Sequence, residues 1–117
     1  RRESTERPPF DDPMVNEALR FIRQNSMIAL SVQEVANYVR VSRRVLETRF
    51  RRIVGQSVLE NICAQRLERV KQLLLKTDMK VSEIAEACEF GTDGYLSRFF
   101  RRESGMTISE FRTREHR

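Results

Sequence analysis

Two segments of the chain place arginines and other polar residues at the spacing of a single helix face. In the first segment the set is Arg44, Glu47, Thr48 and Arg51, and 50 residues later it is Gly94, Ser97, Arg98 and Arg101. Residues at i, i+3, i+4 and i+7 share one face of an α-helix. An arginine on such a face can donate two hydrogen bonds to O6 and N7 of guanine, which distinguishes this base in the major groove. The two segments therefore predict contact with DNA bases.

Residues at the margins of these faces suit the DNA backbone. Arg43, Arg52 and Arg102 lie at the edges of the stripe, where we expect their guanidinium groups to contact phosphates and to fix register without reading sequence. Ser42 and Thr92 stand at the start of the two segments and are favourable helix N-caps. The backbone N–H groups at such a helix start attract phosphate oxygens. We therefore expect both residues to lie at the DNA interface.

The alternative interpretation is that these arginines form a solvated helix face, because arginine is a good helix former. The recurrence of the stripe in both segments favours DNA binding. Arg49 is set apart from the stripe, since it lies three residues after Leu46, where the second segment has Phe99. We expect its side chain to be half-buried along its stem.

The two segments belong to a longer internal repeat, in which residues 31–58 correspond to residues 80–108. Val32 aligns with Val81 at an offset of 49, and from Ser42 onward the offset is 50 because the second copy has one more residue in its turn. Such self-similarity defines the architecture of a chain. Two copies of a helix-turn-helix on one basic chain suit two successive stretches of DNA.

Capping signals and apolar spacing predict an all-α protein of seven helices, with two helix-turn-helix lobes joined by a long central helix. Asp12-Pro13 begins the first helix, Ser31 and Ser57 begin capping boxes, and Gly55 and Gly105 end helices. The predicted helices cover about 13–25, 32–39, 43–54, 58–76, 82–88, 93–104 and 108–111. We expect residues 1–12 to be a linker from a missing upstream domain and residues 13–117 to be a DNA-binding domain. Within it, lobe one covers about 13–56, the linking helix about 57–76 and lobe two about 80–114.

Composition supports a polyanionic partner. The 117 residues carry a formal charge of +5 with a pI near 9.9. Cys63 and Cys88 fall on apolar helical positions and have no metal-binding spacing, so we expect buried free thiols in a reducing cytoplasm in preference to the alternative, a disulfide. The sequence has neither a secretory signal nor an apolar run of membrane-spanning length. We expect a cytoplasmic protein with no metal, no cofactor and no membrane partner.

The ordered set of motifs resembles the DNA-binding domain of the AraC/XylS transcription regulators over about residues 14–114. Copy one contributes "SVQEVA…VS…L…F…G" and the linking helix contributes "QRLE…LL" at 65–74. Copy two contributes "VSEIA…F…YLSRFFRR…G" at 81–105, followed by "EFR" at 110–112. Three residues depart from the family pattern: Glu89 stands where the family usually has Gly, Ile108 replaces a usual Pro, and Gly94 removes one base-reading side chain.

The resemblance implies that the second helix of each lobe enters a major groove. Base-reading positions carried over from the family are Arg44, Glu47, Thr48, Asp93, Gly94, Ser97 and Arg98. Arg66 matches a family arginine that we interpret as a structural ion-pair residue. The resemblance further implies RNA polymerase as a partner and a small-molecule effector that acts only through the upstream domain. The segment from Phe10 to Val15 is similar to the xylose-regulator branch.

Two other function classes compete with sequence-specific DNA binding. A helical interaction module that docks on the transcription machinery would explain the helices, but not the duplicated arginine faces. Salt dependence separates the two, because binding through several phosphates weakens steeply with salt. An enzyme is the weakest hypothesis. The single histidine, His116, stands next to the chain end, and no carboxylate, serine or cysteine has a convincing catalytic partner.

Overall fold

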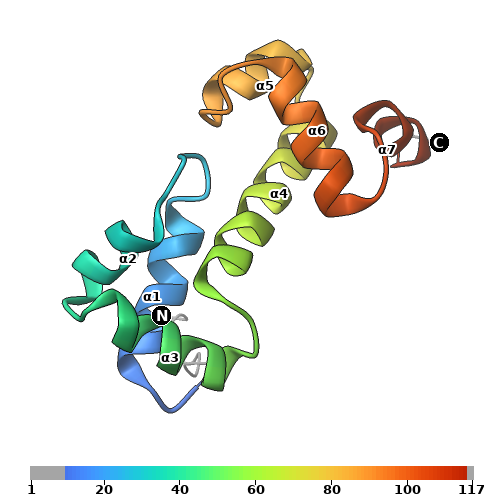
Figure 1. Ribbon diagram of the computed structural model, residues 1–117. Coiled ribbons are helices and arrows are strands. Elements are labelled where there is room, and N and C mark those ends of the chain that lie inside the picture. The colour runs from blue at the N-terminus through green and yellow to red at the C-terminus, as the bar shows by residue number, and fades with distance from the viewer. Residues whose placement is uncertain (1–9, 116–117) are drawn as a thin grey trace, which may run out of the picture.

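The computed structural model describes residues 10–115 of the chain, so residues 1–9 of the expected linker and His116 lie outside the described part. Within that part the chain forms seven helices and no strand, which confirms the predicted all-α fold (Figure 1). The helices are α1 (Pro13–Gln24), α2 (Val32–Val39), α3 (Arg43–Val54), α4 (Val58–Lys76), α5 (Val81–Ala87), α6 (Asp93–Ser104) and α7 (Ile108–Glu115). None of these helices is both long enough and apolar enough to span a membrane.

Side-chain caps determine where most helices begin. Asp12 accepts hydrogen bonds from the backbone N–H groups of Met14 and Val15, and Pro13 occupies the first helical position of α1. Ser31 and Ser57 form capping boxes, in which Glu34 and Glu60 accept a hydrogen bond from the N–H of the cap residue. The predicted starts of these helices are confirmed. They could be predicted because a capping signal depends on residues only three positions apart.

Three helices differ from their predicted bounds. α1 ends one residue early, at Gln24, and α5 ends at Ala87 rather than at residue 88. α5 begins at Val81 because Glu83 accepts a hydrogen bond from the backbone N–H of Lys80, at 2.7 Å. α7 continues past Phe111 to Glu115. Its extension carries Arg112, whose guanidinium donates to the carbonyl oxygens of Leu74 and Met79 at 3.2 and 2.9 Å. Arg112 therefore holds the C-terminal end of α4 and the loop that follows it.

Two separate cores lie at the two ends of α4 (Figure 1). Lobe one (α1–α3) buries Val15, Ala18, Ile22, Leu30, Val32, Val35, Ala36, Val39, Leu46 and Phe50 against Val58 and Ile62 of α4. Lobe two (α5–α7) buries Ile84, Ala85, Cys88, Phe90, Leu96, Phe99, Phe100, Ile108 and Phe111 against Val70 and Leu74 of α4. Each end of the same helix thus completes a different core.

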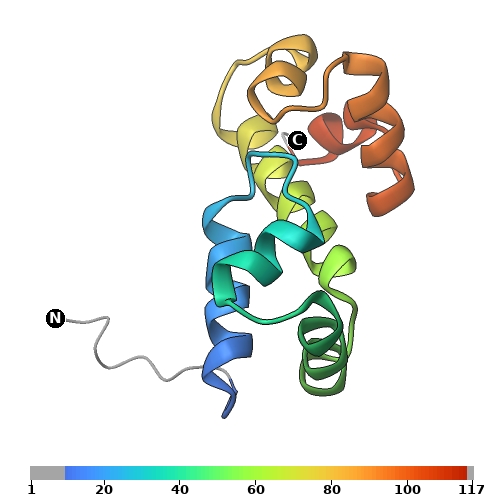
Figure 2. The same ribbon diagram turned by 60° about the vertical axis from the view of Figure 1, so that its left-hand side comes forward.

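The second helices of the two helix-turn-helix motifs lie on the same side of the molecule. In Figure 2, α3 lies below the lower end of α4 and α6 lies to the right of its upper part, both in the right-hand half of the molecule. The molecule measures 40 × 34 × 22 Å along its principal axes. It is therefore a flattened body, with α3 and α6 near opposite ends of α4.

Truncation of a core residue that recurs in both copies of the repeat should destabilise mainly the lobe that contains this residue. Leu46 and Phe100 are fully buried, one in each core, and loss of a buried Leu or Phe side chain costs about 2–5 kcal/mol. We expect Leu46→Ala to accelerate amide hydrogen exchange mainly in α1–α3 and Phe100→Ala mainly in α5–α7, each with a lower melting temperature. Leu59→Ala is the control, because Leu59 is 55% exposed on α4. Melting curves of Leu46→Ala or Phe100→Ala that match that control would contradict the core assignment.

Candidate nucleic-acid interface

α3 presents the polar stripe that its sequence predicts. Leu46 and Phe50 are fully buried, whereas Arg44, Thr48 and Arg51 are exposed. Glu47 is half-buried, and its carboxylate lies 3.7 Å from Nε of Arg43. The buried face anchors the helix, so the side chains opposite to it are free to contact a partner.

α6 exposes the equivalent positions. Asp93, Gly94, Ser97, Arg98 and Arg101 are all exposed, and Leu96 and Phe100 beneath them are fully buried. A Cβ atom built on Gly94 would lie 3.6 Å from Nη1 of Arg98. The Arg98 guanidinium therefore lies next to the backbone of Gly94. Because Gly94 has no side chain, Arg98 covers this part of the helix surface.

The two helix starts have the same geometry. The hydroxyl oxygens of Ser42 and Thr92 accept hydrogen bonds of 3.1 Å from the backbone N–H groups of Val45 and Tyr95. Both cap residues are exposed. The N–H groups that precede Val45 and Tyr95 lie in the first helical turn, where they have no intrahelical acceptor. Each helix start can therefore donate backbone hydrogen bonds to an anionic oxygen at its positive dipole end.

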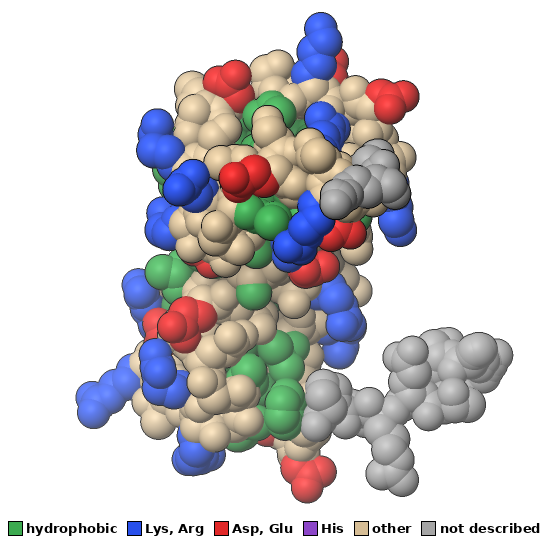
Figure 3. Space-filling model, turned by 90° about the vertical axis from the view of Figure 1, so that its right-hand side faces the viewer, with side chains coloured by type: hydrophobic (Ala, Val, Ile, Leu, Met, Phe, Trp, Pro, Cys, Tyr) green, Lys and Arg blue, Asp and Glu red, His purple; other side chains and the backbone are tan. Residues whose placement is uncertain are grey.

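The arginines of the stripe differ in their partners. Within residues 10–115, neither Arg44 nor Arg98 forms an ion pair. Arg102 lies 3.2 Å from the carboxylate of Glu103 and 5.5 Å from the ring centre of Phe99, so its position at the edge of α6 is already constrained. Arg52 is exposed at the equivalent edge of α3. In Figure 3, basic side chains run along the left-hand edge of both halves, the edge that faces the viewer in Figure 1.

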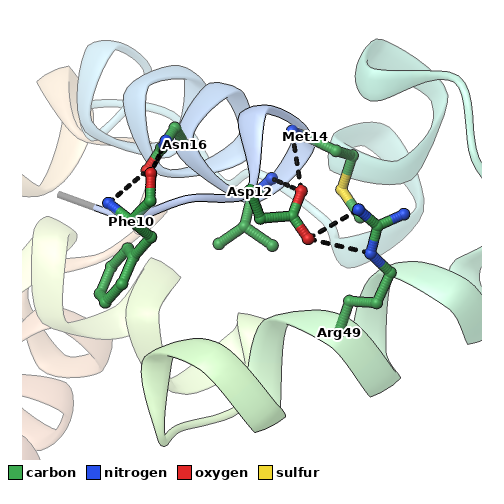
Figure 4. A network of polar contacts seen from close by, with 6 residues as sticks. Phe10, Asp12, Met14, Asn16 and Arg49 are labelled. Atoms are coloured by element: carbon green, nitrogen blue, oxygen red, sulfur yellow. Dashed lines mark hydrogen bonds and ion pairs between the residues drawn. The ribbon is translucent and has the colours of Figure 1, made fainter. Parts of the chain in front are cut away.

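Arg49 lies outside the stripe and binds the start of α1. Its Nε and Nη2 donate to Oδ2 of Asp12 at 3.0 and 2.6 Å, while Oδ1 of Asp12 caps the helix (Figure 4). Asn16 exchanges two hydrogen bonds with the backbone of Phe10 beside this pair. The prediction of a half-buried Arg49 is confirmed, and its guanidinium is paired with Asp12 at the start of α1.

Arg66 of α4 has a structural role, but the predicted ion pair is wrong. Its Nη2 donates to the backbone carbonyl of Cys88, and its guanidinium carbon lies 3.9 Å from the ring centre of Phe90. Among the described residues no carboxylate pairs with it. A carbonyl and an aromatic face replace the carboxylate because Arg66 packs against Cys88 and Phe90 in the turn between α5 and α6. Arg66 therefore anchors that turn to the linking helix.

The turns of the two motifs contain left-handed residues that are not glycine. Arg40 has a φ of 64° and Glu89 has a φ of 59°. The sequence singled out Glu89 as a replacement for a family glycine, and its positive φ explains the family preference. Its side chain accepts a hydrogen bond of 2.8 Å from the backbone N–H of Ala29 in lobe one. No sequence pattern links residues 29 and 89, so this contact was not predicted.

The described residues offer little for covalent or metal chemistry. Cys63 and Cys88 are free thiols, and burial raises the pKa of both above the ordinary range. A thiol with a raised pKa remains protonated at neutral pH and is a poor nucleophile. Across residues 10–115 no cluster of three or more histidine, cysteine or carboxylate side chains could hold a metal ion.

Comparison with known proteins shows what the chain is similar to. A family model described as a helix-turn-helix domain matches residues 35–114. The chain is 32% identical over 111 residues to the xylose operon regulatory protein of Haemophilus influenzae. The aligned segment covers 95% of this chain and 29% of that protein. The chain therefore spans less than a third of the length of this curated relative.

Two solved structures have the same fold. One is a transcriptional regulator with an AraC-type DNA-binding domain from Chromobacterium violaceum, with a TM-score of 0.78 and 33% identity over 86% of this chain and 90% of that chain. The other is the DNA-binding domain of the global transcriptional factor AdpA in complex with a target DNA. It has a TM-score of 0.78 and 27% identity over 91% of this chain and 95% of that chain.

The Asp12–Arg49 pair should make stability depend on pH. Burial alone would raise the pKa of Asp12, but hydrogen bonds from Arg49 and from the N–H of Val15, with the charge of Arg49, lower it overall. A lowered folded-state pKa stabilises the protein above the ordinary carboxyl pKa, and this contribution disappears as the pH falls through the folded-state value. We expect Asp12→Asn to cost about 1 kcal/mol at pH 7 and progressively less below about pH 4.

Urea denaturation at pH 7 and at pH 3 measures this difference. Asn is a good N-cap, so Asp12→Asn removes the charge while the helix start is retained. Arg49→Met is the matched variant and should show the same convergence with the parent at low pH. A constant difference at both pH values would contradict the ionic origin of the contribution.

Proposed function

The chain belongs to the AraC-type family of helix-turn-helix domains of transcription regulators, and we propose that it binds double-stranded DNA by placing α3 and α6 in two successive major grooves. DNA recognition by this family is sequence-specific. The observation that carries the proposal is the equivalent arginine-bearing face on both helices, which lie on the same side of the molecule near opposite ends of α4, together with the basic side chains along one edge of both halves. A helix that contacts base edges can read sequence there, because each base pair has a distinct donor and acceptor pattern in the major groove.

The dimensions of the molecule support this arrangement. Successive major grooves on one side of DNA lie roughly 34 Å apart. The longest axis of the protein is 40 Å, and the 19 residues of α4 extend roughly 28 Å between the lobes. If α4 remains rigid, the DNA bends to meet both recognition helices, at a cost of order 1–6 kcal/mol.

Individual contacts follow from the position of each side chain on its helix. Arg44 lies in the first turn of α3 and Arg98 lies one turn into α6, and both are assigned to bases, together with Glu47, Thr48, Asp93 and Ser97. Arg43, Arg51, Arg52, Arg101 and Arg102 are assigned to phosphates or the edges of the groove, and Ser42 and Thr92 to phosphates at the helix starts. Gly94 has no side chain to contribute, so the half-site under α6 is the more degenerate one.

Because the chain covers only 29% of the Haemophilus influenzae relative, we propose that it is joined through residues 1–12 to an upstream domain that senses a small-molecule effector. That relative is a xylose operon regulatory protein, which supports the xylose-regulator branch. RNA polymerase is the expected second partner, and the cytoplasm is the expected location.

Selection of bound duplexes from random DNA tests the proposal. We expect a motif of two half-sites on one side of the helix with centres about one turn apart, and a footprint over both. Affinity should fall steeply as the salt concentration rises, because several phosphates release counterions. A footprint confined to a half-turn would contradict the two-groove arrangement. Failure to enrich any motif would favour a module that docks on the transcription machinery.

Arginine substitutions should separate base readout from phosphate binding. We expect Arg44→Ala and Arg98→Ala to lose about 1–3 kcal/mol of discrimination between the selected site and its single-base variants. Arg52→Ala and Arg102→Ala should weaken binding to every sequence alike and reduce the salt slope by roughly one unit. The measurement is affinity for each duplex at several salt concentrations. Equal losses for all sequences in Arg44→Ala and Arg98→Ala would show that these arginines are phosphate contacts.

A further inference from the structure

We propose that Glu89 is a positioning residue for DNA recognition: its carboxylate holds lobe two against lobe one and thereby selects the separation of the two half-sites. The inference rests on the proposed DNA binding and extends it, because it assigns the preferred half-site spacing to a residue outside both recognition helices. Glu89 lies in the turn between α5 and α6.

A hydrogen bond between the lobes is the primary observation. The backbone N–H of Ala29 donates to Oε1 of Glu89 at 2.8 Å, across 60 residues of sequence. Ala29 belongs to the loop that joins α1 to α2, and Figures 1 and 2 both show this loop reaching toward the turn between α5 and α6. The two lobes have separate cores, so this contact joins bodies that are otherwise connected through α4.

The backbone conformation of Glu89 shows that the turn itself does not require this side chain. Its φ of 59° lies in the left-handed region that glycine adopts without a steric cost. Arg40, the residue at the same position of the repeat in lobe one, has a φ of 64°. Within the described part of the chain, Arg40 makes no side-chain hydrogen bond or ion pair, whereas Glu89 contacts the other lobe. The carboxylate therefore supplies a contact that glycine could not.

Both ends of the contact are held in place by α4. On the side of lobe one, Nε of Arg69 donates to Oγ of Ser26 at 3.1 Å, and Ser26 is only 4% exposed. On the side of lobe two, Arg66 donates to the carbonyl of Cys88, the residue before Glu89. The hydrogen bond between Ala29 and Glu89 thus closes a ring that runs through the loop, α4 and the turn.

A closed ring restricts rotation of one lobe relative to the other about the axis of α4. Insertion of one base pair between two half-sites turns them by roughly 36° about the DNA axis, since a helical turn contains about 10–10.5 base pairs. A protein with a fixed angle between its lobes can follow such a change only if the DNA is deformed. Glu89 is therefore expected to sharpen the preference for one spacing.

The first test compares spacing preferences in the full chain. The probes are the duplexes selected in the preceding experiment and versions with one base pair inserted or removed between the half-sites. We expect the parent to lose roughly tenfold in affinity when the spacing changes, and Glu89→Gly to lose less than about threefold, because twisting of the DNA is no longer needed. Glu89→Gln retains an acceptor oxygen and should behave as the parent does.

Arg40→Gly is the matched control. It relieves the same left-handed strain at the same position of the repeat, but it removes no contact between the lobes. We expect it to weaken binding to all duplexes through the loss of one positive charge, with the spacing preference of the parent unchanged. A Glu89→Gly protein that keeps the parental spacing preference would overturn the proposal.

The second test requires no DNA and separates this inference from the proposed function. Residual dipolar couplings of backbone amides report whether α1–α3 and α5–α7 share one alignment tensor. We expect one tensor for the parent and for Arg40→Gly, and two different tensors for Glu89→Gly, with faster hydrogen exchange at the Ala29 amide. A single tensor in Glu89→Gly overturns the positioning role even if DNA binds. A parent that has one tensor but selects no bipartite site instead contradicts the proposed function.

Discussion

The sharing of α4 between two cores is the constraint on which the rest of the structure depends. Val58 and Ile62 complete the core of lobe one, and Val70 and Leu74 complete the core of lobe two. Neither lobe can shift along the helix without exposing apolar side chains, so α4 determines the distance between α3 and α6. Their relative orientation is less constrained, because outside α4 the lobes are joined through the hydrogen bond between Ala29 and Glu89. Apolar burial thus sets the distance between the lobes, whereas their orientation depends on hydrogen bonds at Ser26, Cys88 and Glu89.

Packing, rather than charge content, separates the arginines of the interface from those of the scaffold. The sequence contains 22 lysines and arginines, and its net charge alone cannot assign a role to any of them. Arg49, Arg66 and Arg112 bind a carboxylate, a carbonyl beside an aromatic ring, and two carbonyls at the end of α4. These three side chains are committed to protein acceptors. The stripe on α3 and α6 keeps its exposed cations because the core residues of those helices lie on the opposite face.

Features encoded by near neighbours could be predicted from the sequence, and features that need a distant partner could not. The caps at Ser31 and Ser57 and the helix end at Gly55 depend on residues within one turn, and all are confirmed. The partner of Arg66 is a backbone carbonyl 22 residues away, which no pattern of side-chain types reveals. The same applies to Arg112 and the extent of α7. The polar stripe could be predicted because helix periodicity places its residues on one face, but the contact of each residue with DNA depends on a partner absent from the sequence.

Differences between the two copies indicate what each position contributes. Arg49 and Phe99 are equivalent in the repeat, yet Arg49 pairs with Asp12 at the start of α1, while Phe99 packs on Phe90 near Arg66 of α4. The helix that covers this position is α1 in lobe one and α4 in lobe two, so the residue type follows the neighbouring helix. The pair Arg40 and Glu89 is different, because their backbone conformations agree and only the side-chain contact changes. Arg40 and Glu89 thus share a left-handed backbone, but only the Glu89 side chain contacts the other lobe. The difference between these two residues therefore reflects how the lobes are joined rather than how each lobe folds.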